Sequence, residues 1–495
     1  MWCMVTLDFG ISKMPQEWNF RRKVLYYLNF ITVEPTLYLY FMAFMITTVL
    51  ENAFFVDKAC RVNHNLNSSV CDDISNEAYS KLNKEVQITV SNFNFKNDIA
   101  GHGGQIILAM FMGAWSDKRG RKMPLLIGLL GKLYYSSMII VNSLQPTWPV
   151  EYILYTATLP MAFTGADVAI FAAALSYLVD VSSSENRTLR VTLLEVVYLS
   201  TMPTGIALGS YLFGNVVNKS FTIMFSINVS LMILAVLYTC LRLEWRTTDK
   251  QTPLPKLRYV LCDFFDYKHV VFTFKTLFKK RLENRRRYLL LLIGVMGIYT
   301  FQREEKNTCY LYLQNVFHWT VGEISHFRTF QSALQNVGLI TTIPIMSKFF
   351  GWKDTVIVMV GAFANIFGRI FFIQATTSFV FYTGGVFAAV GPIIQPVLRS
   401  MVSKIIAVSE KGATFSVLSV ADNAFPIISG VMYSKLYNST LNTMPNAFFY
   451  LTVVTQLCVI VAVIYIQCTA TSEDNLIHSD KRDDYTDVDA ENVET

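Results

Sequence analysis

The sequence predicts an all-α membrane protein with twelve transmembrane helices in two pseudo-repeat halves of six. Three observations lead to this fold class. Of the 495 residues, 53% are hydrophobic and only 16% are charged, whereas a soluble globular protein carries about 25% charged residues. The apolar residues form runs of about 20, the length that crosses about 30 Å of hydrocarbon. A long basic stretch separates the first six runs from the last six.

Each run is predicted to be a helix, because the bilayer core offers the backbone no water and a crossing segment must satisfy its own hydrogen bonds. The runs lie near residues 31–55, 98–115, 124–143, 151–178, 190–214, 221–241, 288–314, 325–349, 354–376, 379–402, 413–436 and 447–467. The domain boundaries that follow are a cytosolic N-terminus (1–30), a first half (31–243) with a large glycosylated outside loop (56–97), a basic cytosolic linker (244–287), a second half (288–468) and a disordered acidic cytosolic tail (469–495).

Loop charge predicts the orientation. Lys and Arg gather after the second, sixth, eighth and tenth runs, and the first 28 residues lack the apolar core of a signal peptide, so these loops and both termini are expected in the cytosol. This bias explains the net charge of +6 without a nucleic-acid partner. Sequons at Asn67, Asn218 and Asn438 fall on the outside and are predicted to be glycosylated. A plasma membrane or an endolysosomal membrane fits this multi-pass topology equally.

The cysteines and histidines do not indicate a catalytic or metal site. Cys60 and Cys71 share the outside loop, where an oxidising compartment favours a disulfide; free thiols are the alternative. The six histidines are scattered, and the chain has no nucleophile elbow, HExxH motif or phosphate-binding loop. The protein is therefore predicted not to be an enzyme, and to use no cofactor or metal.

Charged residues inside apolar runs are the functional candidates, because each costs about 2.5–3.5 kcal/mol on insertion scales. The seventh run continues from Tyr288 through the consecutive charges Arg303, Glu304, Glu305 and Lys306. Four consecutive side chains cannot share one helix face, so the helix either unwinds there or borders a wet cavity. We expect a substrate cavity, in which Arg303 and Lys306 face an anionic substrate group; a structural knot of ion pairs is the alternative.

Further intramembrane polar residues extend this prediction. The second half adds three residues to the predicted cavity: Arg399, Asp422 and Asn423. In the first half, Asp167 lies midway along the fourth run and Glu195 lies within the fifth. Burial disfavours the charged form of a carboxylate, which lets it hold a proton near neutral pH. We therefore expect Asp167 and Glu195 to couple protons, although Asp167 could instead be locked to Arg369 or Arg399.

The loop between the second and third runs carries the most specific motif, Gly113-Ala-Trp-Ser-Asp117-Lys-Arg-Gly120-Arg121-Lys. Gly120 permits a tight turn, and a carboxylate among four cations suggests a switchable ion pair. A degenerate copy, 347–353, follows the eighth run, as expected for a chain of two parallel repeats. Two such halves are typical of a transporter whose substrate binds between them, near the middle of the membrane.

The same motif resembles the signature of the major facilitator superfamily. The resemblance implies the major facilitator fold. It also implies that Asp117 contacts the start of the eleventh helix near Gly412, and that Arg121 pairs with a neighbouring carboxylate such as Asp180. Asp117, Gly120, Arg121 and Asp180 would then form a conformational latch.

Three stretches resemble solute carrier family 46 more closely: residues 33–35, residues 175–195 and residues 395–399. The resemblance implies proton-driven uptake of a bulky organic anion or conjugate, such as a muropeptide, a steroid conjugate or a folate-like molecule. It also implies that Glu195 couples protons and that Asp117, Arg121 and Arg399 serve conformational change or substrate binding. The folate branch has a histidine in the seventh helix, where this chain has Thr300-Phe-Gln-Arg303, which argues against folate.

The predicted function is secondary active transport by alternating access, with a small organic solute, protons and the lipid bilayer as partners. The rival hypotheses are a proton-independent facilitator and a non-transporting membrane sensor that keeps the fold.

Overall fold

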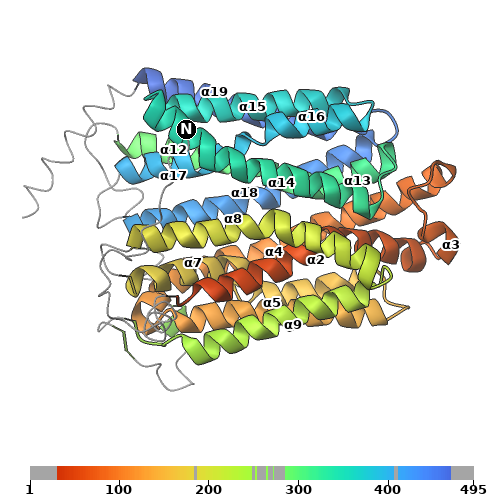
Figure 1. Ribbon diagram of the computed structural model, residues 1–495, viewed down its shortest axis with the longest axis horizontal. Helices are drawn as coiled ribbons and strands as arrows, with labels where there is room; N and C mark the ends of the chain where they lie inside the picture. Colours follow the sequence, from red (N-terminus) through yellow and green to blue (C-terminus); the bar gives the residue numbers. More distant parts are fainter. Residues whose placement is uncertain are drawn as a thin grey trace, which may run out of the picture.

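The computed structural model describes residues 31–182, 187–247, 251–252, 263–265, 271, 285–405 and 411–469. In this part of the chain the regular secondary structure is helical, and the helices run side by side along the long axis of the molecule (Figure 1). Eight of the helical segments are long and apolar enough to cross a membrane. The predicted all-α membrane fold is thus confirmed.

The first half is built from α2 (Glu34–Lys58), α4 (Ser80–Arg119), α5 (Lys122–Leu144), α7 (Ala166–Asp180), α8 (Arg187–Tyr211) and α9 (Phe221–Arg242). Short turns complete it: η2 (Ala59–Asn63), α3 (Ser68–Cys71), η3 (Glu77–Tyr79), η4 (Leu154–Thr158), α6 (Leu159–Ala162) and η5 (Leu212–Val216). The segments η4, α6 and α7 together form the fourth crossing.

The second half is built from α12 (Arg285–Thr300), α13 (Glu305–Val316), α14 (Val321–Pro344), α15 (Asp354–Gln374), α16 (Ser378–Ala388), α17 (Ile394–Ile405), α18 (Lys411–Thr440) and α19 (Ala447–Thr469). The turns η8 (Phe301–Glu304), η9 (Ile345–Phe349) and η10 (Gly391–Ile393) interrupt or extend these helices. The pairs α12–α13 and α16–α17 each form one crossing, so this half also has six.

The second crossing differs most from its predicted range. The predicted run starts at residue 98, but α4 begins at Ser80 and has 40 residues. Its first turns pack Val86, Val90 and Phe93 into the core. Most of the outside loop expected at 56–97 is therefore helical. Hydropathy misses this extension because its other face is polar and pairs with the second half.

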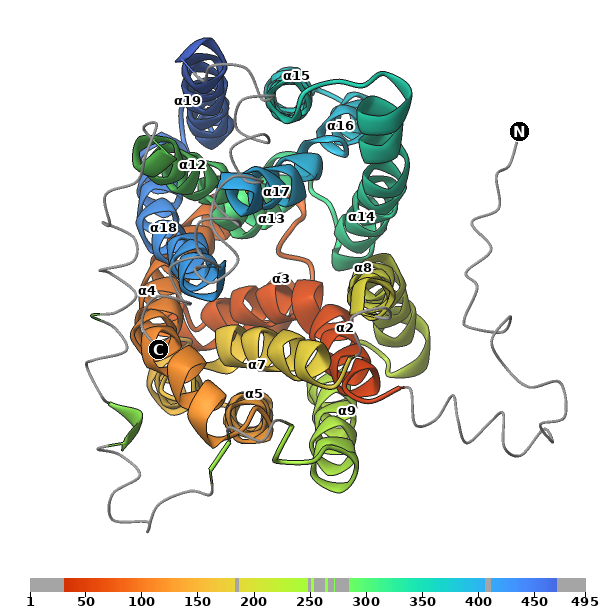
Figure 2. The same ribbon diagram turned by 90° about the vertical axis from the view of Figure 1, so that its left-hand side faces the viewer.

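The two halves meet along two helix pairs, α4 with α18 and α8 with α14. Figure 2, which views the helices end on, shows the first half as one group and the second half as the other, with these pairs between them. Three of these helices, α4, α14 and α18, together with the crossing α12–α13, are absent from the apolar membrane-crossing segments found among the described residues. Some of their polar residues, such as Gln87 and Asn438, contact the other half, and such residues lower the hydropathy of these helices.

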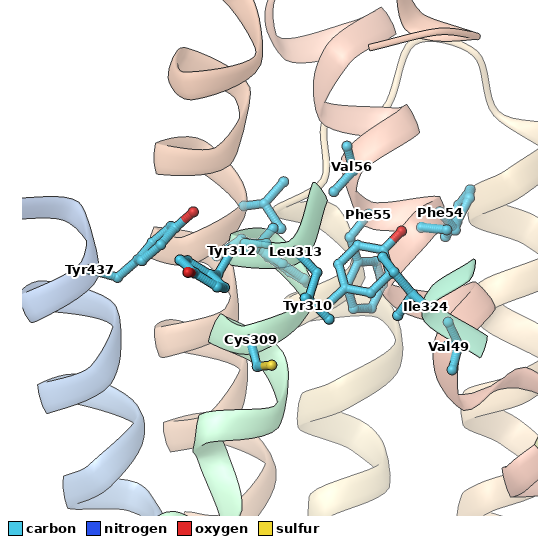
Figure 3. Packing of buried hydrophobic residues seen from close by; sticks show 14 of the residues in the cluster. Val49, Phe54, Phe55, Val56, Cys309, Tyr310, Tyr312, Leu313, Ile324 and Tyr437 are labelled. Carbon is cyan, nitrogen blue, oxygen red and sulfur yellow. The ribbon is translucent and has the colours of Figure 1, made fainter. Parts of the chain in front are cut away.

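The end of the molecule that carries α3, here called the α3 end, is closed by contacts between the halves. Figure 3 shows part of an apolar cluster there, formed by α2, α13, α14 and α18. Gln87 of α4 donates to the carbonyl of Leu311 at 3.0 Å and accepts from the hydroxyl of Tyr437 at 2.7 Å. A disulfide joins Cys60 to Cys71 nearby, with 5.8 Å between the Cα atoms.

The opposite end, here called the Gly120 end, carries the turn between α4 and α5. Gly120 has φ +104°, a conformation that strains any residue with a Cβ. Gly351, in the corresponding turn after η9, also has a positive φ of +62°. The shared backbone geometry supports the predicted correspondence between the two sequence motifs.

Candidate functional site

A cavity of about 540 Å³ lies between the two halves. The first half contributes residues of α2, α4, α5, η4, α6, α7, α8 and α9, and the second half contributes residues of η8, α13, α14 and α18. Its charged and titratable lining residues are Tyr40, Glu51, Asp98, His102, Lys132, Tyr135, Asp167, Tyr198, Arg303, Glu304, Lys306, Tyr310 and Arg328. So many ionisable groups around one cavity mark it as the candidate functional site.

Asp167 lies on the cavity wall of the first half and is paired. The chain breaks its helix at Gly165, whose φ is +76°, and α7 starts afresh at Ala166. Asp167 therefore sits in the first turn, where the helix dipole favours a carboxylate. Nζ of Lys132 lies 2.8 Å from Oδ2 of Asp167, and the hydroxyl of Tyr40 donates to Oδ1. The predicted alternative partners, Arg369 and Arg399, are wrong: the partner is Lys132.

Several charged or titratable residues of the first half that line the cavity were missed by sequence reasoning: Glu51, Asp98, His102 and Lys132. Glu51 of α2 accepts a hydrogen bond from the hydroxyl of Tyr135, and Lys132 of α5 lies beside the same ring at 5.7 Å. Both charges lie inside predicted apolar runs. The rule that singles out intramembrane charges could therefore have found them.

The wall of the second half is cationic. The seventh crossing tightens into the 3-10 turn η8 before α13 begins, and this places Arg303 and Lys306 on the cavity surface. Arg328 of α14, which sequence reasoning missed, donates to the carbonyl of Lys306 at 2.9 Å. Among the described residues, no carboxylate lies within ion-pair distance of these three cations.

Glu305 does not line this cavity, contrary to the prediction. Its neighbour Glu304 faces the cavity, whereas Glu305 points into the second half, where Nη2 of Arg369 lies 3.2 Å from its Oε1. The hydroxyl of Thr452 also donates to Glu305. Consecutive side chains leave a helix about 100° apart, so the four charges divide between cavity and interior. The predicted cavity therefore applies to Glu304, and the alternative of a buried ion pair applies to Glu305.

The other predicted cavity residues divide in a similar way. Asn423 lines the cavity. Asp422, its neighbour on α18, points away from it and pairs with Arg399, whose Nη2 lies 3.1 Å from Oδ2. Arg399 and Asp422 therefore form an ion pair within the second half beside the cavity.

Glu195 is placed differently from the expectation. It is exposed on α8, whereas its neighbour Leu194 is buried. The prediction of a buried carboxylate is thus wrong, because the apolar run does not reveal which helix face turns inward. The buried acid of this region is Glu34, which opens α2 and forms an ion pair at 3.0 Å with Arg190 of α8.

The predicted latch is described in part. The side chain of Asp117 lies outside the described residues, and so does its predicted contact near Gly412. Arg121 lies 3.1 Å from Asp180 and donates to the hydroxyl of Ser116 at 2.6 Å. A Cβ at Gly120 would meet the carbonyl of Trp245, which explains why the turn uses glycine.

Asp263 of the linker binds to residues of α4 at the Gly120 end, a contact that the sequence did not predict. It accepts hydrogen bonds from Arg119 at 2.8 Å, from Lys118 at 2.9 Å and from the indole of Trp115 at 3.0 Å. The Arg119 guanidinium, and after it the Lys118 ammonium, holds the pKa of Asp263 well below its usual range. The linker is therefore fixed to the end of α4 at this point.

The three sequons are not equivalent in the structure. Asn67 and Asn218 are exposed in turns. Asn438 lies within α18, and its Nδ2 donates to Asn92 of α4 at 2.9 Å. An amide held by a helix and by a partner is a poor acceptor for a glycan, so this geometry argues against Asn438. The predicted tail at 469–495 and the N-terminal segment 1–30 lie almost entirely outside the described residues.

The family model of the major facilitator superfamily matches residues 99–353, more than half of the chain. The chain is 24% identical to a "Probable peptidoglycan muropeptide transporter SLC46" of Drosophila melanogaster, over 85% of this chain and 82% of that protein. It is 23% identical to a lysosomal proton-coupled steroid conjugate and bile acid symporter of Gallus gallus, over 90% and 95%. It is 24% identical to a proton-coupled folate transporter of Bos taurus, over 77% and 80%.

Solved structures show the same fold. The human organic anion transporter MFSD10 aligns with a TM-score of 0.58 at 14% identity, over 87% of this chain and 97% of that one. A D-xylose-proton symporter aligns with a TM-score of 0.62 at 14% identity, over 89% and 97%. The relatives are named as transporters, which agrees with the prediction that the chain is not an enzyme. The chain belongs to the major facilitator superfamily, and its similarity to transporters of solute carrier family 46 confirms the predicted resemblance.

Proposed function

We propose that this protein is a proton-coupled secondary transporter of a bulky organic anion and that it works by alternating access. The observation that carries the proposal is the cavity between the halves, whose second-half wall presents Arg303, Lys306 and Arg328 without carboxylate partners among the described residues. Cations without carboxylate partners in a cavity favour a ligand that brings negative charge. Two cations on neighbouring turns suit a carboxylate, sulfate or phosphate group.

The first-half wall suits the remainder of such a ligand. Phe41, Phe44, Met45 and Met202 line it beside the hydroxyl groups of the tyrosines. Apolar and aromatic surface of this kind buries a ring system or a lipid-like body. The relatives are named for muropeptides, for steroid conjugates and bile acids, and for folate, and we infer the same broad class of large organic solutes here.

Alternating access requires two states that differ at the two ends of the cavity. The contacts at the α3 end support a state that is closed there. In this proposal the α3 end faces the outside or an organelle lumen, and both termini face the cytosol. Asp117, Gly120, Arg121 and Asp180 latch the Gly120 end in the opposite state. Asp167, which lines the cavity, and Glu195, which is exposed on α8, are the two residues that the sequence predicts to couple protons. The membrane is the plasma membrane or an endolysosomal one.

The test is uptake by cells that express the protein. Labelled muropeptide, steroid sulfate and folate are supplied at about pH 5.5 and about pH 7.4, and at least one is expected to enter faster in acid. Lys306→Gln removes one charge-assisted hydrogen bond, worth about 1.5–3 kcal/mol, so the KM for uptake should rise about tenfold to a hundredfold. Lys404→Gln is the matched control, because Lys404 is an exposed lysine paired with Asp354 outside the cavity.

Two outcomes contradict the proposal. Uptake that is equal at both pH values identifies a proton-independent facilitator. Binding of a solute to the purified protein without flux into proteoliposomes identifies a sensor.

A further inference from the structure

Two carboxyl groups, one from each half, touch each other at the cavity. Asp98 of α4 and Glu304 of η8 are within hydrogen-bonding distance of one another, and both line the cavity. Glu304 is only 7% exposed. Two carboxylates in contact in a poorly solvated place cannot both stay ionised, because the repulsion between like charges is not screened. One proton shared between the two carboxyl groups removes this repulsion.

Among the described residues, no lysine or arginine forms an ion pair with Asp98 or Glu304 that would neutralise the two carboxylates in place of the proton. Nε2 of His102 lies 3.6 Å from Oε1 of Glu304, and the amide of Asn307 donates to Oε2 at 3.2 Å. The charged and titratable groups that face the pair from the surrounding elements are His102 on α4, Lys132 and Tyr135 on α5, Arg303, Glu305 and Lys306 on η8 and α13, Arg328 on α14 and Tyr433 on α18.

Among the described residues, the basic side chain that lies within 4 Å of a carboxyl oxygen of this pair is His102. The other cations face the cavity or, like Lys132, are paired with another acid. The second ring nitrogen of His102, Nδ1, is buried and has no hydrogen-bond partner in the described part of the chain. His102 is thus placed to exchange a proton with Glu304.

The pair also occupies a mechanically important place. Asp98 packs against Gly430 of α18, where an added Cβ would lie 2.9 Å from Oδ2. Further toward the α3 end, the same two helices are joined through Asn92 and Asn438 at 2.9 Å and through Gln87 and Tyr437 at 2.7 Å. The carboxyl pair therefore forms the cavity-side end of the contacts that close the α3 end.

We propose that Asp98 and Glu304 bind one proton jointly, with His102 as the adjacent base, and that this proton holds the two halves together at the α3 end. Loss of the proton to cavity water, by way of His102, leaves two carboxylates in contact beside a neutral imidazole, and their repulsion separates α4 from η8 and α18. This inference rests on the proposed function, because it assigns the proton of the transport cycle to a site between the halves. The bound species is a proton, not a metal or an organic anion.

The consequence is a defined order of events. A proton that enters from the α3 end permits closure of that end, and its release into the cavity from the closed state favours reopening. A single exchanged proton changes the ratio of open to closed molecules by up to tenfold per pH unit. The pH response therefore belongs to the conformation itself and exists without substrate.

The experiment measures that conformation directly. Spin labels are attached at Asp73 and Asn442, two exposed residues near the α3 end, one in each half. Cysteines other than Cys60 and Cys71 are replaced, and distances between the labels are recorded by pulsed electron paramagnetic resonance in lipid nanodiscs. The wild type is expected to show a short distance at about pH 5.5 and a growing population of longer distances up to about pH 8, with a slope of up to tenfold per pH unit.

Asp98→Asn and Glu304→Gln are the decisive variants. Each places an amide against the remaining carboxylate, so the hydrogen bond no longer needs a proton, and the short distance should persist at every pH. Glu77→Gln is the matched control, because Glu77 is an exposed carboxylate near the α3 end that the proposal does not involve; it should respond to pH as the wild type does. Two independent isosteric variants guard against loss of folding in one of them.

A pH response that survives in both Asp98→Asn and Glu304→Gln overturns the inference. So does a response that is lost in Asp167→Asn or Glu195→Gln and retained in these two, which would assign the proton to the residues predicted from sequence. Because no solute is added, failure here is separate from failure of transport. A wild type that transports with proton coupling but shows no pH-dependent distance contradicts the inference and leaves the proposed function standing.

Discussion

The ion pair between Arg369 and Glu305 fastens α15 to α13 in the interior of the second half. Nη2 of Arg369 lies 3.2 Å from Oε1 of Glu305, and the side chains are 9% and 7% exposed. Arg369 also donates to Oδ1 of Asn365 at 2.8 Å, and Glu305 accepts from Thr452. Removal of one partner therefore leaves the other charge buried with neutral partners only.

The magnitude follows from that burial. Breaking a buried pair from one side costs about 3–5 kcal/mol, because an uncompensated charge stays in the interior, whereas replacing both partners by apolar groups is often neutral. We predict that Arg369→Met and Glu305→Met are each strongly destabilised. The double variant Arg369→Met/Glu305→Met should be more stable than either single variant.

The assay is unfolding of the purified proteins in detergent, followed by tryptophan fluorescence and by the monodisperse fraction on size exclusion. Lys404→Met is the matched control, because its partner Asp354 lies in an exposed pair that is worth about 0–1 kcal/mol. The reasoning is refuted if the single variants unfold like the wild type, or if the double variant is no more stable than the weaker single variant.

Three further predictions concern packing, pH and the disulfide. A Cβ at Gly209 would meet the backbone carbonyl of α2, so Gly209→Ala should lower stability by about 1–3 kcal/mol. Gly214→Ala, which meets nothing within 4 Å, should not, and equal unfolding of the two variants would contradict the packing. Arg119 and Lys118 lower the pKa of Asp263. The ionised Asp263 therefore stabilises the fold fully above the ordinary carboxyl pKa, and this stabilisation is lost as the pH falls toward the lowered pKa. Asp263→Asn should flatten the acid limb of a curve of stability against pH, and an unchanged limb would count against this role of Asp263. Loss of the bridge in Cys60→Ala/Cys71→Ala should cost about 2–4 kcal/mol, measured as faster proteolysis of the α3 end; an unchanged cleavage rate would argue against its role.

The fold was predictable because hydropathy and chain length decide it. Runs such as 354–376 and 447–467 match α15 and α19 within a few residues, since a helix must bury about 20 residues to cross the bilayer. The start of α4 at Ser80 was not predictable in this way. Its first turns satisfy their polar groups on the other half, and local hydropathy contains no information about that partner.

The site was predictable in its residue types and less so in its partners. Arg303, Lys306 and Asp167 line the cavity because a charge in an apolar run needs either water or a counter-ion. Whether such a charge meets water or a counter-ion depends on the helix face that carries it and on elements distant in the sequence. Lys132 of α5 pairs with Asp167 of α7, and Glu305 of α13 pairs with Arg369 of α15. The spacing of these residues in the sequence predicts neither pair.

The central claim is that a proton gradient drives flux of an organic anion through the cavity. Purified protein is reconstituted into liposomes and supplied with labelled steroid sulfate, muropeptide or folate. The outside is held at about pH 5.5 and the inside at about pH 7.4, or both sides are held at about pH 7.4. The account predicts that at least one solute accumulates only with the gradient and that a protonophore abolishes the accumulation. Accumulation that is the same with and without the gradient, or no flux of a solute that the protein binds, would contradict it.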